Sequence, residues 1–406
     1  MRKDKKKSKK TRRLFEKKKR EIFSLTEVGF LTLMTLMLGI LLGVMLCYCK
    51  INILDASDKK LQEIISTYNN ISNNSIYNVD KDKIADAAIS GMIESIDDNY
   101  SDFLTKDETK SFDQSLGGYY EGLGITITKD EANNTVIMEV AKGSPADKAG
   151  IKRDDILISV DDKAATTDDI FTISDYVSKA GKKTLNVTVK RNNKELEFKM
   201  KRARVEVESA TFGTYGDLGY IDINNFALNT GKQFNEKLKE AKKYKVKGLI
   251  IDLRDNPGGH LGQVNSIVEP FFKKNTVIYQ IKDNKIISKV RTTNKDSMNI
   301  PVVILVNESS ASASEIVASC FAENYKNVTL VGKMTYGKGT IQKEVKLSTG
   351  SSIKYTTQKW LTSKGKWLDH ENNIGIKPDV EVDYCNDKVC KEDMQLEKAK
   401  EILNKE

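Results

Sequence analysis

The chain has 406 residues, with 66 Lys or Arg against 57 Asp or Glu, and its formal net charge is +9 at pH 7. Residues 2–20 contain thirteen of the basic residues, and only four acidic residues precede residue 28, so the N-terminal tail carries the whole excess. A nucleic-acid-binding fold needs a basic face on its folded part, so this distribution argues against nucleic acid as a partner. Two histidines and five scattered cysteines without a C-x-x-C pair predict no metal site and no cofactor.

Residues 1–27 form this basic tail, and residues 28–49 follow it without a charged side chain. About twenty apolar residues cross a bilayer, so we expect a transmembrane helix at 28–49. Basic residues before a span hold that end in the cytoplasm, which predicts a single-pass protein of the cell membrane whose remainder is extracytoplasmic. A cleaved signal peptide has the same order of segments, but the apolar stretch is long for one and lacks a small-x-small cleavage site.

Residues 55–110 contain apolar residues at helical spacing on both sides of a polar linker at 69–78. These are Leu61, Ile64, Ile65, Tyr68, Ile84, Ala87, Ala88, Met92 and Ile93. The pattern predicts an N-terminal helical region made of amphipathic helices.

The sequence pattern of residues 112–204 predicts short strands with one or two intervening helices, which suit a small, partly open β-barrel. A G-L-G-I turn formed by Gly122, Leu123, Gly124 and Ile125 precedes an alternating strand. This order of elements resembles a PDZ domain. The resemblance implies that the amides of the turn bind a terminal carboxylate while the adjacent strand edge pairs with an extended peptide. A purely structural barrel is the alternative.

Residues 205–383 hold the candidate catalytic residues. An apolar strand at 248–253 ends in R-D-N-P-G-G at 254–259. Paired glycines after a proline allow positive φ and a close approach of the backbone to a ligand, although the same letters also make an ordinary turn. His260 follows, either as an exposed turn residue or as a titrating group near the cleft.

A second apolar strand, beginning at Val302, leads into a serine cluster and then a helical pattern. We expect Ser312 to be a nucleophile and Lys338, which lies among glycines one strand later, to be the base that activates it. A lysine in a desolvated pocket loses its proton near neutral pH, whereas two histidines leave few candidates for a histidine triad. Ser312 and Glu315 also have the spacing of a capping box, which is compatible with catalysis because a helix start supplies free amides.

The glycines around Lys338 also fit a phosphate-binding loop. Residues 332–338 read G-x-x-x-x-G-K, but Gly339 stands where Ser or Thr should hold magnesium. A phosphate-binding loop is followed by a helix, whereas residues 340–347 alternate like a strand. Nucleotide binding is therefore disfavoured.

Three motifs together resemble the carboxy-terminal processing proteases, the tail-specific family of serine peptidases. They are D-L-R-D-N-P-G-G at 252–259, S-A-S-A-S-E-I at 310–316 and Y-G-K-G-T-I-Q at 336–342. The likeness extends from about residue 80 to the end of the chain. It implies that Ser312 is the catalytic serine, that Lys338 is the general base and that Gln342 orients the lysine amine.

The same resemblance makes the amides of Gly258, Gly259 and Ala313 the expected oxyanion donors. Some relatives have an aspartate downstream of the serine, where this chain has Glu323 in a segment with one extra residue, so the resemblance assigns Glu323 no role. Related proteases dimerise through N-terminal helices. A homodimer and packing within one chain are therefore alternative explanations for the helical region.

Residues 384–406 end in an amphipathic pattern that predicts a C-terminal helix. Cys385 and Cys390 flank a short polar loop outside the membrane, where disulfides persist, so a local bridge and two free thiols stay alternatives. Cys320 follows Ser312 in an apolar helical pattern and is expected as a small buried hydrophobe.

We therefore expect an α+β multidomain protein with an N-terminal membrane anchor, a helical segment, a PDZ-like partly open β-barrel and a mixed α/β tail-specific protease core. The expected activity is that of a serine endopeptidase that cleaves near the accessible C-terminal tails of protein substrates, in proteolytic signalling or envelope-protein processing. The alternative is a catalytically inactive PDZ scaffold that binds such tails, and the presence of both Ser312 and Lys338 argues against it.

Overall fold

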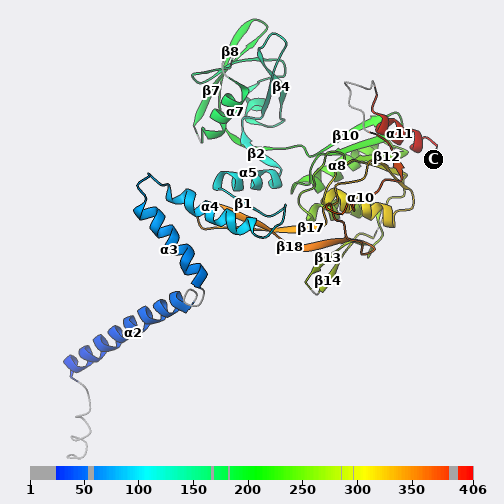
Figure 1. Ribbon diagram of the computed structural model, residues 1–406. Coiled ribbons are helices and arrows are strands. Elements are labelled where there is room, and N and C mark those ends of the chain that lie inside the picture. The colour runs from blue at the N-terminus through cyan, green and yellow to red at the C-terminus, as the bar shows by residue number, and fades with distance from the viewer. Residues whose placement is uncertain are drawn as a thin grey trace, which may run out of the picture. The chain divides into compact units, whose positions relative to one another are not determined.

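The computed structural model describes residues 24–53, 59–165, 169–181, 183–284, 286–295, 297–383 and 392–405 (Figure 1). The chain divides into two compact units, residues 1–88 and residues 89–406. Most of the basic tail, and both Cys385 and Cys390, lie outside the described residues.

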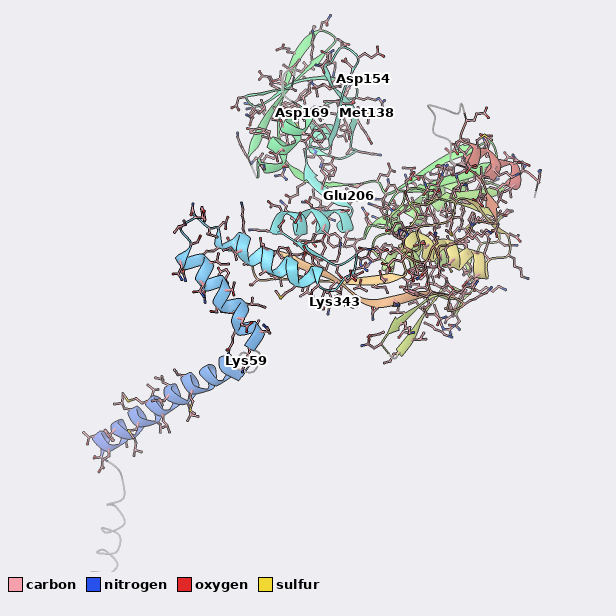
Figure 2. All side chains as sticks on the ribbon, in the orientation of Figure 1. Lys59, Met138, Asp154, Asp169, Glu206 and Lys343 are labelled. Atoms are coloured by element: carbon pink, nitrogen blue, oxygen red, sulfur yellow. The ribbon has the colours of Figure 1, made fainter. Side chains whose placement is uncertain are left out.

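The first described helix, α2 (Leu25–Ile53), is apolar along most of its length. Its segment Thr26–Met45 has a mean hydropathy of 2.3 and no buried residue. The large apolar side chains of its residues 28–45 are exposed, and the helix is drawn with its described side chains in Figure 2. By length and composition the helix is able to cross a membrane, and a signal sequence near the N-terminus meets the same criteria.

Two further helices, α3 (Lys59–Asn74) and α4 (Lys81–Glu94), match the predicted amphipathic pattern. Neither helix has a buried residue. Ile64 of α3 and Ile84 of α4 line a shallow hollow of about 350 Å³. The apolar faces of these helices are therefore only partly covered within the described chain.

The expected small barrel is a sheet with the strand order β3-β4-β5-β7-β8, to which the short β6 adds beside β5. The strands are β3 (Ile125–Lys129), β4 (Thr135–Val140), β5 (Ile156–Val160), β6 (Lys163–Ala164), β7 (Thr184–Arg191) and β8 (Lys194–Lys201), with helices α6 (Pro145–Ala149) and α7 (Ile170–Lys179). This module has a hydrophobic core of its own, which includes Ile137, Leu157 and Val187. The edge strand β3 pairs only with β4 among the described strands, so its outer edge is open to an added strand.

A pair of strands, β2 (Tyr119–Gly122) and β9 (Ala203–Glu206), joins the two ends of this module. The helix α5 (Lys106–Gly117) precedes β2 and crosses the expected boundary at residues 110–112. Its N-terminus is a complete capping box, in which Thr105 and Glu108 satisfy each other's backbone amides.

The second module is built on a six-stranded sheet with the order β10-β11-β12-β15-β16-β19, parallel from β11 onward. The strands are β10 (Ala210–Tyr215), β11 (Leu218–Ile223), β12 (Gly248–Asp252), β15 (Val302–Val306), β16 (Val328–Gly332) and β19 (Val380–Glu381). Every residue of β12 and β15 is buried, as expected for parallel strands covered on both faces.

Helices cover the two faces of this sheet. The helices α8 (Thr230–Tyr244), α9 (Gly262–Val268) and α10 (Ala313–Asn324), with the 3₁₀ turn η1 (Glu269–Phe271), share one hydrophobic core. The C-terminal helix α11 (Met394–Leu403) packs through Ala399 and Leu403 on the other face. The α+β multidomain architecture is confirmed.

A second sheet, whose described strand pairs are all antiparallel, completes this module. Its strands are β1 (Asp102–Leu104), β13 (Val277–Asp283), β14 (Ile286–Arg291), β17 (Thr340–Lys346) and β18 (Ser352–Thr362). The long strand β18 pairs with β1, β13 and β17. The predicted strand after Gly339 is thus confirmed as β17, which leaves no helix for a phosphate-binding loop at that position.

Candidate active site

Three loops of the candidate site leave the carboxyl ends of neighbouring parallel strands. β12 leads into the proline-glycine-glycine loop, β15 leads into the serine cluster, and β16 leads into the loop that holds Lys338. Because β12, β15 and β16 are adjacent and parallel, the three loops emerge at the same edge of the sheet.

Ser312 has backbone angles of φ 55° and ψ −111° at the residue before α10. A positive φ is uncommon for a residue with a side chain and persists where the surroundings enforce it. Gly258 lies directly against this turn, since a Cβ atom at Gly258 would be 2.9 Å from Ser312 Cβ and 2.7 Å from Ala311 O. Glycine is therefore required at position 258 for the two loops to meet.

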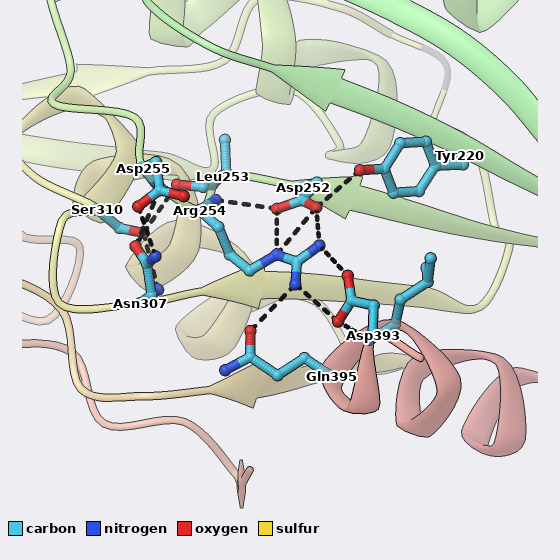
Figure 3. Close-up of polar contacts among 10 residues, drawn as sticks. Tyr220, Asp252, Leu253, Arg254, Asp255, Asn307, Ser310, Asp393 and Gln395 are labelled. Carbon is cyan, nitrogen blue, oxygen red and sulfur yellow. Dashed lines mark hydrogen bonds and ion pairs between the residues drawn. The ribbon is translucent and has the colours of Figure 1, made fainter. Parts of the chain in front are cut away.

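Hydrogen bonds fix the two loops to each other (Figure 3). Ser310 Oγ donates to Leu253 O at 2.7 Å, and Asn307 Nδ2 donates to Asp255 Oδ1 at 2.8 Å. The amide of Asp255 in turn donates to Asn307 Oδ1 at 2.9 Å. These contacts bring the strand ends of β12 and β15 into one rigid unit.

Asn256 stabilises the glycine loop through two side-chain hydrogen bonds, a role that the sequence analysis did not predict. It is fully buried, and its Nδ2 donates to Ile223 O at 2.6 Å while its Oδ1 accepts from the Gly258 amide at 2.9 Å. The Gly258 amide therefore already has an internal acceptor. Within the described chain no hydrogen bond uses the amides of Gly259 and Ala313.

The carboxylate of Glu315 connects the serine turn to the lysine loop. Glu315 is fully buried and accepts from the amide of Ser312 at 2.7 Å. It also accepts from Thr335 Oγ1 at 2.6 Å, from the Gly337 amide at 2.6 Å and from the Lys338 amide at 2.9 Å. Burial raises the pKa of Glu315, and these donors oppose that shift. Glu315 of the S-x-x-E motif therefore links the serine turn to the lysine loop, in addition to capping the start of α10.

Lys338 lies partly buried in the cleft with its Nζ 4.6 Å from the centre of the Tyr100 ring. Burial lowers the pKa of Lys338, and the positive charge of Lys354 lowers it further, whereas the carboxylates of Asp98 and Glu315 act in the opposite direction. The net direction is downward, toward the neutral amine that a general base requires.

One cleft of about 710 Å³ brings most of the predicted catalytic residues together. Its lining includes Ser312, Lys338, Gln342, Gly258, Gly259 and His260. Gln342 Nε2 donates to Thr340 Oγ1 and to Thr356 Oγ1, each at 2.9 Å, and makes no hydrogen bond to Lys338 in the described structure. The exposed His260 accepts from the Gly262 amide through Nδ1, so it lies at the cleft and also closes a turn.

The side chain of Glu323 lies away from this cleft. It accepts hydrogen bonds from Thr362 Oγ1, Ser363 Oγ and the Lys364 amide, which ties the end of α10 to the end of β18. Cys320 is fully buried, and burial raises the pKa of its thiol to about 12, so the expectation of a small buried hydrophobe is confirmed.

A charged cluster lies between the end of β12 and the start of α11 (Figure 3). Arg254 donates to both oxygens of Asp252, and its guanidinium also pairs with Asp393 at 2.8 Å, at the start of α11. Tyr220 donates to Asp252 at 2.8 Å. The cluster fixes the loop to the C-terminal helix, and α11 therefore contributes to the rigidity of the site.

The predicted carboxylate-binding turn has two free amides. Leu123 is buried in the core of its module, and no hydrogen bond of the described chain uses the amides of Leu123 and Gly124. Gly124 has φ +82°, and a Cβ atom there would lie 2.1 Å from Ser144 Cβ. The turn between Gly122 and Ile125 therefore requires glycine at 124 and leaves two donors beside the open edge of β3.

Comparisons with known proteins agree with this architecture. The model of peptidase family S41 matches residues 217–382, that of the PDZ domain matches residues 122–201, and that of the activating protease CtpB N-terminal domain matches residues 50–109. The likeness of the small barrel to a PDZ domain is thereby confirmed.

The chain is also similar to individual proteins over most of its length. The chain is 32% identical over 338 residues to a probable CtpA-like serine protease of Staphylococcus aureus (strain COL), covering 82% of this chain and 67% of the relative. A protein of the same description from Staphylococcus haemolyticus is 32% identical over 327 residues, covering 80% and 65%. The solved photosystem II D1 C-terminal processing protease is 23% identical, with a TM-score of 0.47, covering 80% of this chain and 94% of that chain.

Proposed function

Because the chain belongs to peptidase family S41 and is a serine-type C-terminal processing peptidase, we propose that Ser312 is its nucleophile and Lys338 its general base. The observation that carries the proposal is that both residues line one cleft where parallel strands end. The positive φ at the half-buried Ser312 and the lowered pKa of Lys338 suit a nucleophile on a tight turn and its base.

The reaction then follows from this arrangement. Neutral Lys338 accepts the Ser312 Oγ proton as the oxygen attacks the scissile carbonyl, which forms a tetrahedral oxyanion. The resulting ammonium donates its proton to the leaving amine, so the peptide bond breaks and an acyl ester remains on Ser312. Lys338 next accepts a proton from the water that attacks the ester, and it returns this proton to Ser312 Oγ as the ester bond breaks and the shortened chain leaves.

The free amides of Gly259 and Ala313 are the proposed oxyanion donors. Amide donors that are fixed before the reaction stabilise the developing charge, and each typically contributes about 10²-fold or more in rate. The Gly258 amide, which donates to Asn256, positions the loop in this state. Gln342 Nε2 is engaged by two threonines, which leaves its carbonyl oxygen as the acceptor that orients the Lys338 amine.

The PDZ domain is proposed to bind the C-terminal tail of a protein substrate. The amides of Leu123 and Gly124 are free to donate to a terminal carboxylate, and the open edge of β3 is able to pair with the residues before it. The partners are therefore proteins with accessible C-terminal tails.

The helix α2 is proposed as a retained membrane anchor of a single-pass protein. Its apolar length and the basic tail before it support a cytoplasmic N-terminus and an extracytoplasmic catalytic domain, suited to envelope-protein processing or proteolytic signalling. The partly exposed apolar faces of α3 and α4 support a homodimer formed through these helices.

The test uses the full chain in detergent with an unstructured protein that ends in an apolar tail. We expect shortened product, and a mass increase at Ser312 when the acyl intermediate is trapped by acid quenching. Ser312→Ala and Lys338→Ala should lower turnover by at least about a thousandfold with unchanged circular dichroism. Binding of the tail without any cleavage by the unmodified chain would instead favour the inactive scaffold.

A further inference from the structure

Residues 98–101 lie beside the loop that holds Lys338, although they precede it by about 240 residues in the sequence. Residues 98–101 precede β1, and β1 pairs with β18 in the register Asp102 to Lys354. The amide of Thr356 on β18 donates to Ser101 Oγ at 3.1 Å. The pairing therefore holds residues 98–101 beside the strands that present the candidate base and its neighbours.

Tyr100 supplies an aromatic face for Lys338. The Lys338 Nζ atom lies 4.6 Å from the ring centre, within the range of a cation–π contact. Burial raises the pKa of the Tyr100 hydroxyl, and its hydrogen bond with Tyr336 raises it further, so the ring stays neutral. Tyr336 is itself stacked on His370 with ring centres 3.9 Å apart, which fixes the partner of Tyr100.

Asp98 controls the direction of a chain of hydrogen bonds that ends at Gln342. Although burial opposes it, hydrogen bonds from Ser101 and Thr356 lower the pKa of Asp98, so its carboxylate is an acceptor only. Thr356 Oγ1 donates to Asp98 at 2.6 Å and has thereby used its single proton. It is able only to accept from Gln342, which must present its amide nitrogen and keep its carbonyl oxygen for another partner.

We propose that Asp98 and Tyr100 are positioning residues of the Ser312 and Lys338 site: the Tyr100 ring seats the lysine amine, and Asp98, through Thr356, sets the orientation of the Gln342 amide. This inference rests on the proposed role of Lys338 as the base. It adds a part of the site that the motifs at 252–259, 310–316 and 336–342 do not contain.

Other ionisable groups also lie near Lys338. Lys354 approaches from β18, Glu315 from α10, and Asp98 from the segment before β1, while His260 and Glu344 line the same cleft. The Tyr100 ring and the Asp98 carboxylate favour the ammonium form. Removing either one should therefore impair positioning and, at the same time, let Lys338 lose its proton at a lower pH.

The first experiment compares Tyr100→Leu with Tyr100→Phe in the full chain, with kcat/KM measured against pH. In Tyr100→Leu we expect the plateau of kcat/KM to be about tenfold lower. The acidic limb of the profile should move about 0.5 to 1.5 units toward lower pH, because the loss of the cation–π contact destabilises the ammonium form of Lys338. Tyr100→Phe keeps the ring and should keep the limb in place. Limbs that coincide in the leucine variant and the unmodified chain would overturn the role of Tyr100.

The second experiment tests the chain through Thr356. Thr356→Val removes the hydroxyl, whereas Thr356→Ser retains it, so the valine variant should lose about tenfold in kcat with little change in KM and the serine variant should recover most of it. Asp98→Asn removes the carboxylate that fixes the Thr356 hydroxyl proton, and this variant should also lose about tenfold in kcat. The double variant Asp98→Asn with Thr356→Val should lose no more than either single variant, and independent, multiplying losses would overturn the shared path.

Two controls separate this inference from the proposed function. Labelling of Ser312 by a fluorophosphonate reports the nucleophile without a peptide substrate, and its rate should fall in Tyr100→Leu and Thr356→Val. The exposed Tyr77, changed to Leu, should leave labelling unchanged. Full activity in Ser312→Ala would reject the proposed function, whereas an inactive Ser312→Ala together with unaltered rates and pH limbs in the Tyr100 and Thr356 variants would reject only the positioning residues.

Discussion

Glu315 accepts a hydrogen bond from the backbone amide of Ser312 at 2.7 Å, three residues before it in the chain. The same carboxylate accepts from the amide of Lys338 at 2.9 Å. One buried side chain therefore fixes both members of the proposed dyad relative to each other, and it does so through backbone atoms that do not take part in proton transfer.

The substitution Glu315→Gln should uncouple the two loops. A glutamine side chain has one acceptor oxygen, whereas four donors converge on Glu315, so at least one buried donor loses its partner. We expect a loss of about 2–4 kcal/mol in unfolding free energy and a drop of about tenfold to a hundredfold in kcat, measured by urea titration and steady-state kinetics.

Glu323→Gln is the matched control for this prediction. Glu323 also accepts three hydrogen bonds from its surroundings, but these lie at the end of β18 and away from the cleft. The variant should lose stability and keep its kcat. Equal loss of kcat in the two variants would show that the Glu315 effect is a general consequence of destabilisation.

The value of kcat/KM should rise with pH as Lys338 loses its proton, because only the neutral amine accepts the serine proton. The ionisation of Lys338 therefore sets the acidic limb of the pH profile. Burial and the charge of Lys354 place the pKa of Lys338 below its ordinary value. Lys354→Met removes a positive charge that disfavours the ammonium, so the limb should move by a few tenths of a unit or more toward higher pH. The measurement is kcat/KM from pH 5 to 10.

Lys343→Met provides the comparison for Lys354. Lys343 is an exposed residue of β17 (Figure 2) and is not part of the cleft lining. Its removal changes the net charge by the same amount as Lys354→Met but should leave the limb where it is. A limb that shifts equally in both variants would indicate a general charge effect and no specific influence of Lys354.

Asp222 should make the stability of the chain depend on pH. Burial and the neighbouring charge of Asp252 raise the pKa of Asp222 to about 6, whereas Arg254 opposes the shift. The folded chain binds the Asp222 proton more tightly than the unfolded chain does. The contribution of this proton to the free energy of unfolding is therefore present below about pH 4 and is lost as the pH rises through 6. Asp222→Asn should therefore stabilise the chain at pH 7.5 by about 1–2 kcal/mol after discounting for solvent screening.

Urea titrations at pH 4 and pH 7.5 check this prediction. The gain in Asp222→Asn should be present at pH 7.5 and vanish near pH 4, while Asp283→Asn, at an exposed position, should be neutral at both. A gain of the same size at both values would contradict a titrating origin.

The order of elements around the site was predictable from local patterns. The apolar strands before the glycine loop and before Ser312, and the alternating strand after Gly339, became β12, β15 and β17 because hydrophobic runs and alternation are local signals. Two parallel strand ends that lie side by side then bring Gly258 and Ser312 together.

The remaining parts of the site depend on contacts that no local pattern reports. Tyr100 meets Lys338 only because β1 pairs with β18, and sequence spacing says nothing about that pairing. The Gly258 amide was an expected oxyanion donor, yet Asn256 engages it through a side chain two residues away. Glu315 had the spacing of a capping box, and its contacts with the lysine loop required the folded position of β16.

The final prediction concerns the PDZ domain. If the free amides of Leu123 and Gly124 bind a terminal carboxylate, amidation of a tail peptide removes the charge that they recognise. A charge-assisted hydrogen bond contributes about 1.5–3 kcal/mol, so affinity should fall roughly tenfold to a hundredfold. Tail-peptide affinity is measured on the full-length Ser312→Ala chain, where no cleavage interferes.

Cleavage of free-acid and amidated substrates by the unmodified chain shows whether binding also controls activity. If the PDZ domain only captures the tail, the loss in kcat/KM at low substrate concentration should match the loss in affinity. If tail binding also shifts the protease between a less active and a more active state, the loss in cleavage should exceed the loss in affinity, because the ligand binds the two states differently. Equal affinity and equal cleavage for the two forms would show that the turn at 122–125 does not read the chain end, and substrate choice would then belong to the cleft at Ser312.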